Sequence, residues 1–141
     1  FGLIAVGCTY FVQALQITVD VLLLGLACGL VINNILVVNN YRDLDEDIRA
    51  SKRTLVVMMG RRFAQIQYLG STVLSAAILL VLAWKQNAFW LGLACIPLSY
   101  GLIIGARLHR LSTADEFLVV LKASGVIVAA FGILVSVGLL V

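Results

Sequence analysis

The segment NNYRDLDEDIRASKRT, residues 39–54, interrupts an otherwise apolar chain. It carries four acidic and four basic side chains, whereas only 12% of the 141 residues are charged and 62% are hydrophobic. A soluble domain is typically about half apolar and about a quarter charged. A chain this apolar cannot bury its surface in one small core, so we expect lipid to be its solvent.

Four complete apolar stretches lie on either side of this segment. They are residues 19–40, 63–84, 88–106 and 118–141. Each is near the ~20 residues that a helix needs to cross ~30 Å of hydrocarbon. Because backbone groups in lipid must be hydrogen-bonded internally, we predict helices rather than open strands. The sequence therefore predicts an all-α fold, a polytopic transmembrane helical bundle.

The beginning of the chain, residues 1–12, is apolar from the first position. It lacks the charged region and the small-residue cleavage site of a signal peptide. We interpret it as the end of a membrane helix that begins upstream. This interpretation makes the chain the C-terminal part of a longer protein.

Basic residues are distributed unevenly between the connections. Segments 41–62 and 107–117 hold eight of the ten Lys and Arg residues, segment 12–20 holds none, and segment 85–87 holds only Lys85. Positive charge collects in the cytoplasmic loops of membrane proteins. We therefore predict a multi-pass protein of the cell inner (plasma) membrane, with 41–62 and 107–117 cytoplasmic and the C-terminus on the other side. The net charge of +3 is too small to suggest a nucleic-acid partner.

A row of polar side chains runs from the first of these spans into the charged segment. Its members are Asn33, Asn40, Asp43 and Asp47. Their offsets of 0, 7, 10 and 14 place them on one face of a continuous helix. Asp45 and Glu46 are then expected to point elsewhere. Polar groups within an apolar span are costly and tend to be functional, so this face is the candidate site.

The two carboxylates of this face, Asp43 and Asp47, are one helical turn apart, an arrangement that suits a hard cation. Proteins hold Mg²⁺ with one or two carboxylates together with substrate phosphates. Lys52 and Arg53 follow the pair and would meet phosphate oxygens, with Arg as the bidentate partner. Asn40 offers an amide one turn earlier. The residues thus predict a site for a Mg²⁺-bound diphosphate at the membrane surface.

Other interpretations apply to the same segment. A charge run between two membrane helices is often only a solvated loop, which would leave the chain as a structural membrane subunit without enzymatic activity. Asp43, Asp45 and Asp47 match the first ligands of a calcium-binding loop, but Ile48 stands where Gly is needed and Thr54 where Glu is needed. The calcium loop is therefore set aside, and the solvated loop stays open.

The remaining reactive side chains receive structural interpretations. The three cysteines are isolated within apolar segments and lack the spacing of metal ligands, so we interpret them as reduced packing residues. His109 lies between basic residues and is interpreted as an interfacial residue. The spans 88–106 and 118–141 are nearly free of polar side chains, which argues against an ion channel or transporter.

The charged segment resembles the second Asp-rich motif of the UbiA-type intramembrane prenyltransferases. Within that family it most resembles the branch that prenylates 1,4-dihydroxy-2-naphthoate, whose motif reads close to N-N-x-R-D-x-x-x-D-x-x-x-G-K-x-T-L. The matching residues of this chain are Asn39, Asn40, Arg42, Asp43, Asp47, Lys52, Thr54 and Leu55. Ser51 stands where the family usually has Gly, and Met58 stands where Arg is common. Arg61 and Arg62 are candidates to replace that Arg.

This resemblance implies that residues 1–141 form the C-terminal part of a nine-helix UbiA-type domain, with its second Asp-rich motif at 39–54. It implies a Mg²⁺-dependent prenyltransferase of menaquinone or phylloquinone biosynthesis. Its partners are a polyprenyl diphosphate, the aromatic acceptor 1,4-dihydroxy-2-naphthoate and the lipid membrane. A sibling enzyme with another aromatic acceptor stays open as an alternative. The family's first motif, N-D-x-x-D-x-x-x-D, does not occur in these 141 residues and is expected upstream.

The resemblance also implies a mechanism. Mg²⁺ neutralises the diphosphate, the allylic C–O bond ionises, and the electron-rich naphthoate ring attacks the cation with loss of the carboxylate. Asp43 and Asp47 are then the catalytic and metal-binding residues. The candidate substrate-binding residues are Asn33, Asn40, Lys52 and Arg53.

Overall fold

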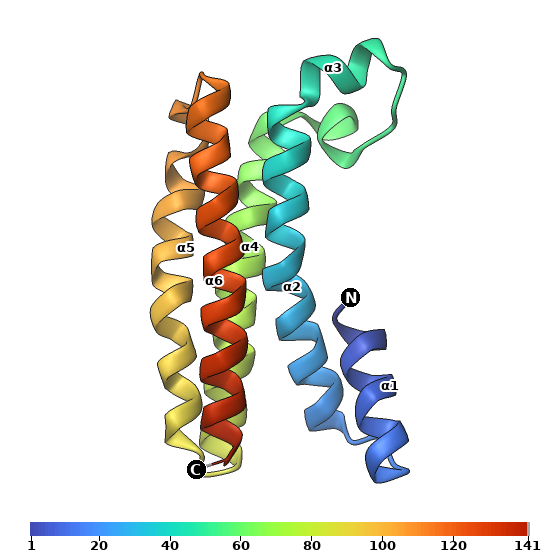
Figure 1. Ribbon diagram of the computed structural model, residues 1–141, viewed down its shortest axis with the longest axis vertical. Helices are drawn as coiled ribbons and strands as arrows, with labels where there is room; N and C mark the ends of the chain where they lie inside the picture. Colours follow the sequence, from blue (N-terminus) through green and yellow to red (C-terminus); the bar gives the residue numbers. More distant parts are fainter. Residues whose placement is uncertain (141) are drawn as a thin grey trace.

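The computed structural model describes residues 1–140, which form an assembly of helices (Figure 1). The helices are α1 (Leu3–Ala14), α2 (Val19–Arg42), α3 (Leu44–Arg49), α4 (Leu55–Lys85), α5 (Cys95–Arg107) and α6 (Ala114–Leu140), with 3-10 turns η1 (Phe89–Ala94) and η2 (Leu108–Arg110). No strand occurs within the described residues. The prediction of an all-α bundle is confirmed.

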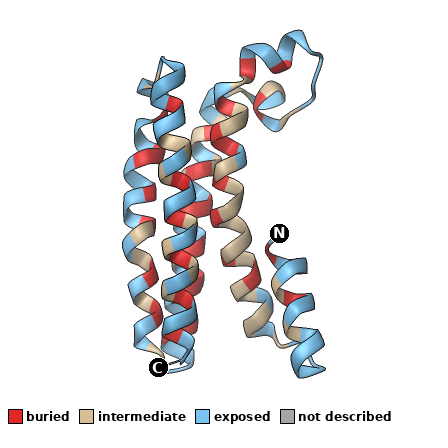
Figure 2. Ribbon diagram, in the orientation of Figure 1, coloured by how far each residue is buried: buried red, intermediate tan, exposed pale blue. Residues whose placement is uncertain are grey.

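Four segments are long and apolar enough to cross a membrane. They are Val19–Arg42, Leu55–Lys85, Phe89–Arg110 and Ala114–Leu140. Each contains most of a predicted span, and the shorter apolar helix α1 packs beside α2. Many large apolar side chains remain exposed on the outer helix faces, while buried residues line the faces that meet inside the bundle (Figure 2). The chain is a multi-pass membrane protein.

Successive long helices run in opposite directions, so the two ends of the bundle hold different connections (Figure 1). One end holds α3 and the link between α5 and α6. We call this the motif end, residues 41–62 and 107–117. The opposite end, the far end, holds residues 14–20 and 85–90. The two basic segments thus share one end, as expected from the charge distribution, and the cytoplasmic side of that end stays a prediction.

Polar side chains on α4 connect this helix with its neighbours inside the bundle. Thr72 Oγ1 accepts a hydrogen bond from Asn34 Nδ2 of α2 at 2.9 Å, and Ser75 Oγ donates to the carbonyl of Ala27 at 3.1 Å. The hydroxyl of Tyr68 lies 3.4 Å from a serine hydroxyl of α6. Such bonds contribute on average ~0.6 kcal/mol each in membranes. They therefore fix how the helices are aligned more than how strongly they associate.

At the motif end, α4 contains a sharp break at Gly60, where φ is 84° and ψ is 172°. This backbone region is accessible essentially only to glycine. The residues before the break, 55–59, form one short turn that is capped by Thr54, whose Oγ1 accepts from the Val57 N–H at 3.2 Å. A Cβ at Gly60 would meet no atom within 4 Å. Glycine is therefore required here by the backbone conformation alone.

Candidate functional site

The charged segment begins at the junction of α2 and α3. Asp43 lies between the two helices, with φ −86° and ψ 7°, and α3 leaves the axis of α2 (Figure 1). The Asp47 N–H still bonds to the Asp43 carbonyl at 2.8 Å, so the turn is preserved through the bend. The row that was expected to follow one straight helix is therefore divided after Asp43.

The Asp43 carboxylate is held by its neighbour in the sequence. Arg42 donates from Nε to Oδ1 at 2.6 Å and from Nη2 to Oδ2 at 3.0 Å, a bidentate pair. The hydrogen bond from Arg42 holds the pKa of Asp43 below its ordinary value, and the positive charge of Lys52 acts in the same direction. Asp43 is therefore an anion at neutral pH, with a cation already beside it.

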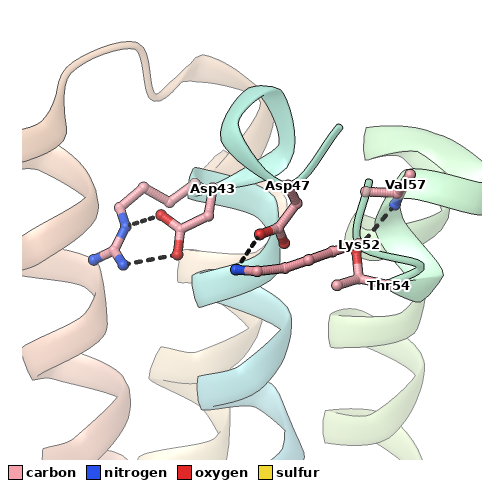
Figure 3. A network of polar contacts seen from close by, with 6 residues as sticks. Asp43, Asp47, Lys52, Thr54 and Val57 are labelled. Carbon is pink, nitrogen blue, oxygen red and sulfur yellow. Dashed lines mark hydrogen bonds and ion pairs between the residues drawn. The ribbon is translucent and has the colours of Figure 1, made fainter. Parts of the chain in front are cut away.

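The Asp47 carboxylate is buried, with 3% of the residue exposed, and accepts a hydrogen bond from Lys52 Nζ at 2.8 Å (Figure 3). That bond raises the pKa of Lys52, and the charges of Asp43 and Glu46 add to the effect. Figure 3 shows the Asp43 and Asp47 side chains near each other. They form an acidic pair in which Arg42 is bonded to the first carboxylate and Lys52 to the second.

A cavity of about 830 Å³ opens at the motif end beside this pair. Its lining consists of Tyr41, Arg42, Asp43, Asp45, Glu46, Arg61, His109, Leu111, Ser112, Ala114, Asp115, Phe117 and Leu118. Asp45 and Glu46 therefore face the same space as Asp43, which corrects the expectation that they point elsewhere. The bend after Asp43 is the reason. Asp45 is paired with Arg61 Nη2 at 3.1 Å, and Asp47 is not part of the lining.

The opposite wall of the cavity comes from α6 and the segment before it. Phe117 packs against Tyr41 with ring centroids 5.8 Å apart and planes tilted by 40°. Arg61 Cζ lies 5.7 Å from the centre of the Tyr41 ring, a cation–π contact. His109 and Asp115 complete this wall. Only one sequence feature pointed to these residues, the basic character that predicts 107–117 at the same end as 41–62.

The other predicted site residues lie outside this cavity. Asn33 and Asn40 are half-buried and Arg53 is exposed, and none of them lines it. The buried amide is Asn34, which is 4% exposed and donates to Thr72 of α4. Its Oδ1 has no partner among the described residues. The amide that packs between the helices is therefore Asn34, the residue directly after the predicted Asn33.

The acidic pair fits one kind of metal coordination. Within residues 1–140, no group of three or more His, Cys, Asp or Glu side chains is arranged to hold a metal ion by itself. Mg²⁺ commonly takes only one or two carboxylates, and phosphate oxygens and waters complete its shell. Asp43 and Asp47 supply that donor set. Arg42 and Lys52 are ion-paired with these carboxylates.

The fold and this site define a class, the polytopic membrane proteins that present an acidic, ion-paired motif at one end of a helical bundle. Residues 1–121 match the UbiA prenyltransferase family. The match covers most of the chain, and the chain belongs to this family. The resemblance of the charged segment to the family's motif is thereby supported by the flanking helices.

Several curated relatives are named 1,4-dihydroxy-2-naphthoate octaprenyltransferase. The protein from Haemophilus influenzae is 36% identical over 84 residues, which cover 60% of this chain and 27% of the relative. The Mycobacterium tuberculosis protein is 33% identical over 99 residues, 70% of this chain and 34% of the relative. The Mycobacterium leprae protein is 29% identical over 140 residues, 96% of this chain and 46% of the relative. The chain spans less than half the length of each, and no solved structure matches it.

Proposed function

We propose that this chain is the C-terminal, diphosphate-binding part of a UbiA-type domain that transfers a polyprenyl group to 1,4-dihydroxy-2-naphthoate. The donor is a polyprenyl diphosphate, and the reaction belongs to menaquinone or phylloquinone biosynthesis. One observation carries the proposal: the Asp43 and Asp47 carboxylates lie near each other, the first bonded to Arg42 and the second to Lys52 (Figure 3). The names of the relatives support the choice of acceptor.

Asp43 and Asp47 are the proposed catalytic and metal-binding residues. A bound Mg²⁺ would supply stabilisation of the negative charge that develops on the leaving diphosphate. Arg42 and Lys52 already stand at the two carboxylates, within 2.6 Å and 2.8 Å of their oxygens. With Mg²⁺ held by the two carboxylates, Arg42 and Lys52 would be placed to donate to phosphate oxygens. The ion pairs thus keep cations at the position where the leaving group needs them.

The remaining residues have supporting roles in the proposal. Lys52 and Arg53 bind the diphosphate, and Asn40 and Asn33 bind substrate along the end of α2. The apolar helix faces hold the prenyl chain and keep water from the allylic cation. The motif end faces the cytoplasm of the cell, where a soluble acceptor and a diphosphate are both accessible, and the protein resides in the inner membrane.

The test compares carboxylates at the two ends of the bundle in the full-length protein. Asp43→Asn and Asp47→Asn keep the shape of the side chain but remove its charge, and each should lower prenyl transfer by about 100-fold or more. Chelation of divalent cations should abolish transfer, and added Mg²⁺ should restore it. Asp20→Asn is the matched control, because Asp20 is ion-paired with Lys85 at the far end. It should leave the rate unchanged.

Wild-type rates in both motif variants would contradict the proposed metal site. Full loss in Asp20→Asn as well would assign the effect to folding instead. Assays with a set of aromatic acceptors settle the substrate. Transfer to another aromatic hydroxy acid in place of 1,4-dihydroxy-2-naphthoate would leave a sibling activity of the same family, and no transfer to any acceptor would return the chain to a structural role.

A further inference from the structure

His109 stands at the wall of the motif-end cavity and is fixed there by α4. Gln65 Nε2 lies 3.0 Å from the carbonyl oxygen of Gly105 and 3.1 Å from that of Ala106. The same nitrogen lies 3.2 Å from His109 Nδ1. One amide group therefore caps the end of α5 and contacts the imidazole that follows it.

These contacts favour one position for the hydrogen on the His109 ring. The two carbonyl oxygens can only accept, so the Gln65 amide must present its NH₂ group to them; the flipped amide would place its own oxygen against two acceptors. The NH₂ group also lies 3.2 Å from His109 Nδ1, which accepts from it only when Nδ1 carries no hydrogen. This arrangement places the ring N–H of His109 at Nε2.

The backbone around this imidazole is held in place on both sides. Leu108, before it, is completely buried. After it, Thr113 Oγ1 accepts from the Glu116 N–H at 3.3 Å, and Glu116 Oε2 accepts from the Thr113 N–H at 3.1 Å. This reciprocal capping box fixes the start of α6. His109 is thus part of a preformed wall and needs no loop closure to be in position.

The surroundings of His109 in the cavity suit an aromatic ligand that carries oxygen. The wall combines the Tyr41 and Phe117 rings with the Arg61 guanidinium, which is already paired with Asp45. Asp115 adds a negative charge to the same wall, which is unfavourable for a multiply charged diphosphate. The N–H donor beside aromatic faces instead matches a ring hydroxyl or a single ring carboxylate, which carries less negative charge than a diphosphate.

We propose that His109 is a specificity-determining residue that donates from Nε2 to an oxygen of the aromatic acceptor, on the wall opposite Asp43. This inference rests on the proposed function and adds to it the place where the acceptor is recognised. Diphosphate binding remains with the Asp43, Asp47 and Lys52 side of the site. No described residue accepts a hydrogen bond from His109 Nε2, so the donor is available to a ligand.

Two substitutions in the full-length protein test the two nitrogens of the imidazole separately. The amide of His109→Asn occupies the position of Nδ1 and still accepts from Gln65, but it removes the Nε2–H donor. The amide of His109→Gln reaches the position of Nε2 and keeps a donor there. His109→Asn should raise the KM for the aromatic acceptor about tenfold, the size of one lost hydrogen bond to a charged oxygen, with the KM for the prenyl diphosphate unchanged. His109→Gln should restore most of the acceptor affinity.

An unchanged acceptor KM in His109→Asn would overturn the inference, and so would a rise confined to the prenyl diphosphate, which would assign the donor to phosphate instead. A loss shared equally by His109→Asn and His109→Gln would show a merely structural role. Equilibrium binding of 1,4-dihydroxy-2-naphthoate, measured without prenyl diphosphate, gives a readout that needs no turnover. If the wild-type protein binds this acceptor through His109 but transfers nothing to it, the proposed function fails while the inference stands.

Discussion

Both ends of the bundle are charged, but the ion pairs at the two ends join different parts of the chain. The motif end holds three pairs: Arg42–Asp43 and Lys52–Asp47 join residues one and five positions apart, and Arg61–Asp45 joins residues 16 positions apart. The far end holds one pair, in which Lys85 Nζ lies 2.6 Å from Asp20 Oδ1 and Gln86 adds a hydrogen bond at 3.2 Å. That pair spans 65 positions and joins the start of α2 to the end of α4.

The difference separates two uses of charge. A pair between neighbours adds little constraint on the fold, since the chain already holds both groups close together. In the proposed function, the charges of such pairs exchange partners when an ion or a diphosphate binds. A pair between distant helices instead constrains how the helices are placed. We therefore expect the motif end to use charge for binding and the far end to use it for assembly.

The largest expected effect is an all-or-none difference in thiol labelling between the two sides of the membrane. In a protein without Cys8, Cys28 and Cys95, single cysteines are placed at Glu46 and Ser112 of the motif end, or at Phe89 of the far end; all three positions are exposed. A membrane-impermeant thiol reagent should label the first two only from the cytoplasmic face and the third only from the outside. Labelling of the first two from opposite faces would refute the shared motif end.

A smaller effect is expected from two glycines that differ only in backbone conformation. Gly60 has φ +84° at the motif end, Gly70 lies within the helix α4, and a Cβ at either would meet no atom within 4 Å. Gly60→Ala should lower the free energy of unfolding by about 1–3 kcal/mol, whereas Gly70→Ala should raise it by about 0.5–1 kcal/mol. Thermal unfolding in detergent checks both. Equal changes in the two variants would mean that the break in α4 is not maintained.

The third prediction distinguishes a specific diphosphate contact from simple charge attraction. Lys52→Gln should weaken prenyl-diphosphate binding about tenfold at saturating Mg²⁺, because a charge-assisted hydrogen bond is lost. Arg49→Gln is the matched control, because Arg49 is exposed on α3 and the substitution removes one positive charge, as Lys52→Gln does. It should have little effect. Equal weakening in the two variants would favour a solvated basic loop that responds only to its total charge.

The smallest effect is expected at the far end. Asp20→Asn, Lys85→Gln and the double variant form a double-mutant cycle for the Asp20–Lys85 pair. The Lys85 side chain is 58% exposed, and exposed ion pairs contribute little because water and salt screen them, so the coupling energy should be small and shrink further in high salt. The cycle is measured by unfolding in detergent. A coupling of zero would remove the proposed contrast between assembly and binding.

Apolar length and charge distribution were sufficient to predict the four spans and the shared end of the basic segments. Both are local properties that lipid enforces directly. The pairing of side chains was not predictable in the same way. The helical period favoured Asn33, but the direction in which α2 faces α4 selects Asn34. That direction depends on packing between residues 38 positions apart, which no single-helix pattern encodes.

The candidate site likewise has a local part that the sequence predicts and a long-range part that it does not. Its local part, the adjacency of Asp43, Asp47 and Lys52, follows from the motif itself. Its long-range part, the Arg61–Asp45 pair and the wall that contains His109, depends on the bend after Asp43 and on the contact between α2 and α6. A sequence pattern that assumes a straight helix cannot contain that bend. For this reason Asp45 was expected away from the cavity that it lines.

The buried amide of Asn34 has a consequence for biosynthesis. The partner of its Nδ2 is Thr72, which lies 38 residues later in the chain and on another helix. A helix α2 in the bilayer without α4 lacks this partner, in a solvent that cannot hydrogen-bond the amide. The insertion of α4 therefore satisfies a polar group of α2 as well as adding a helix beside it.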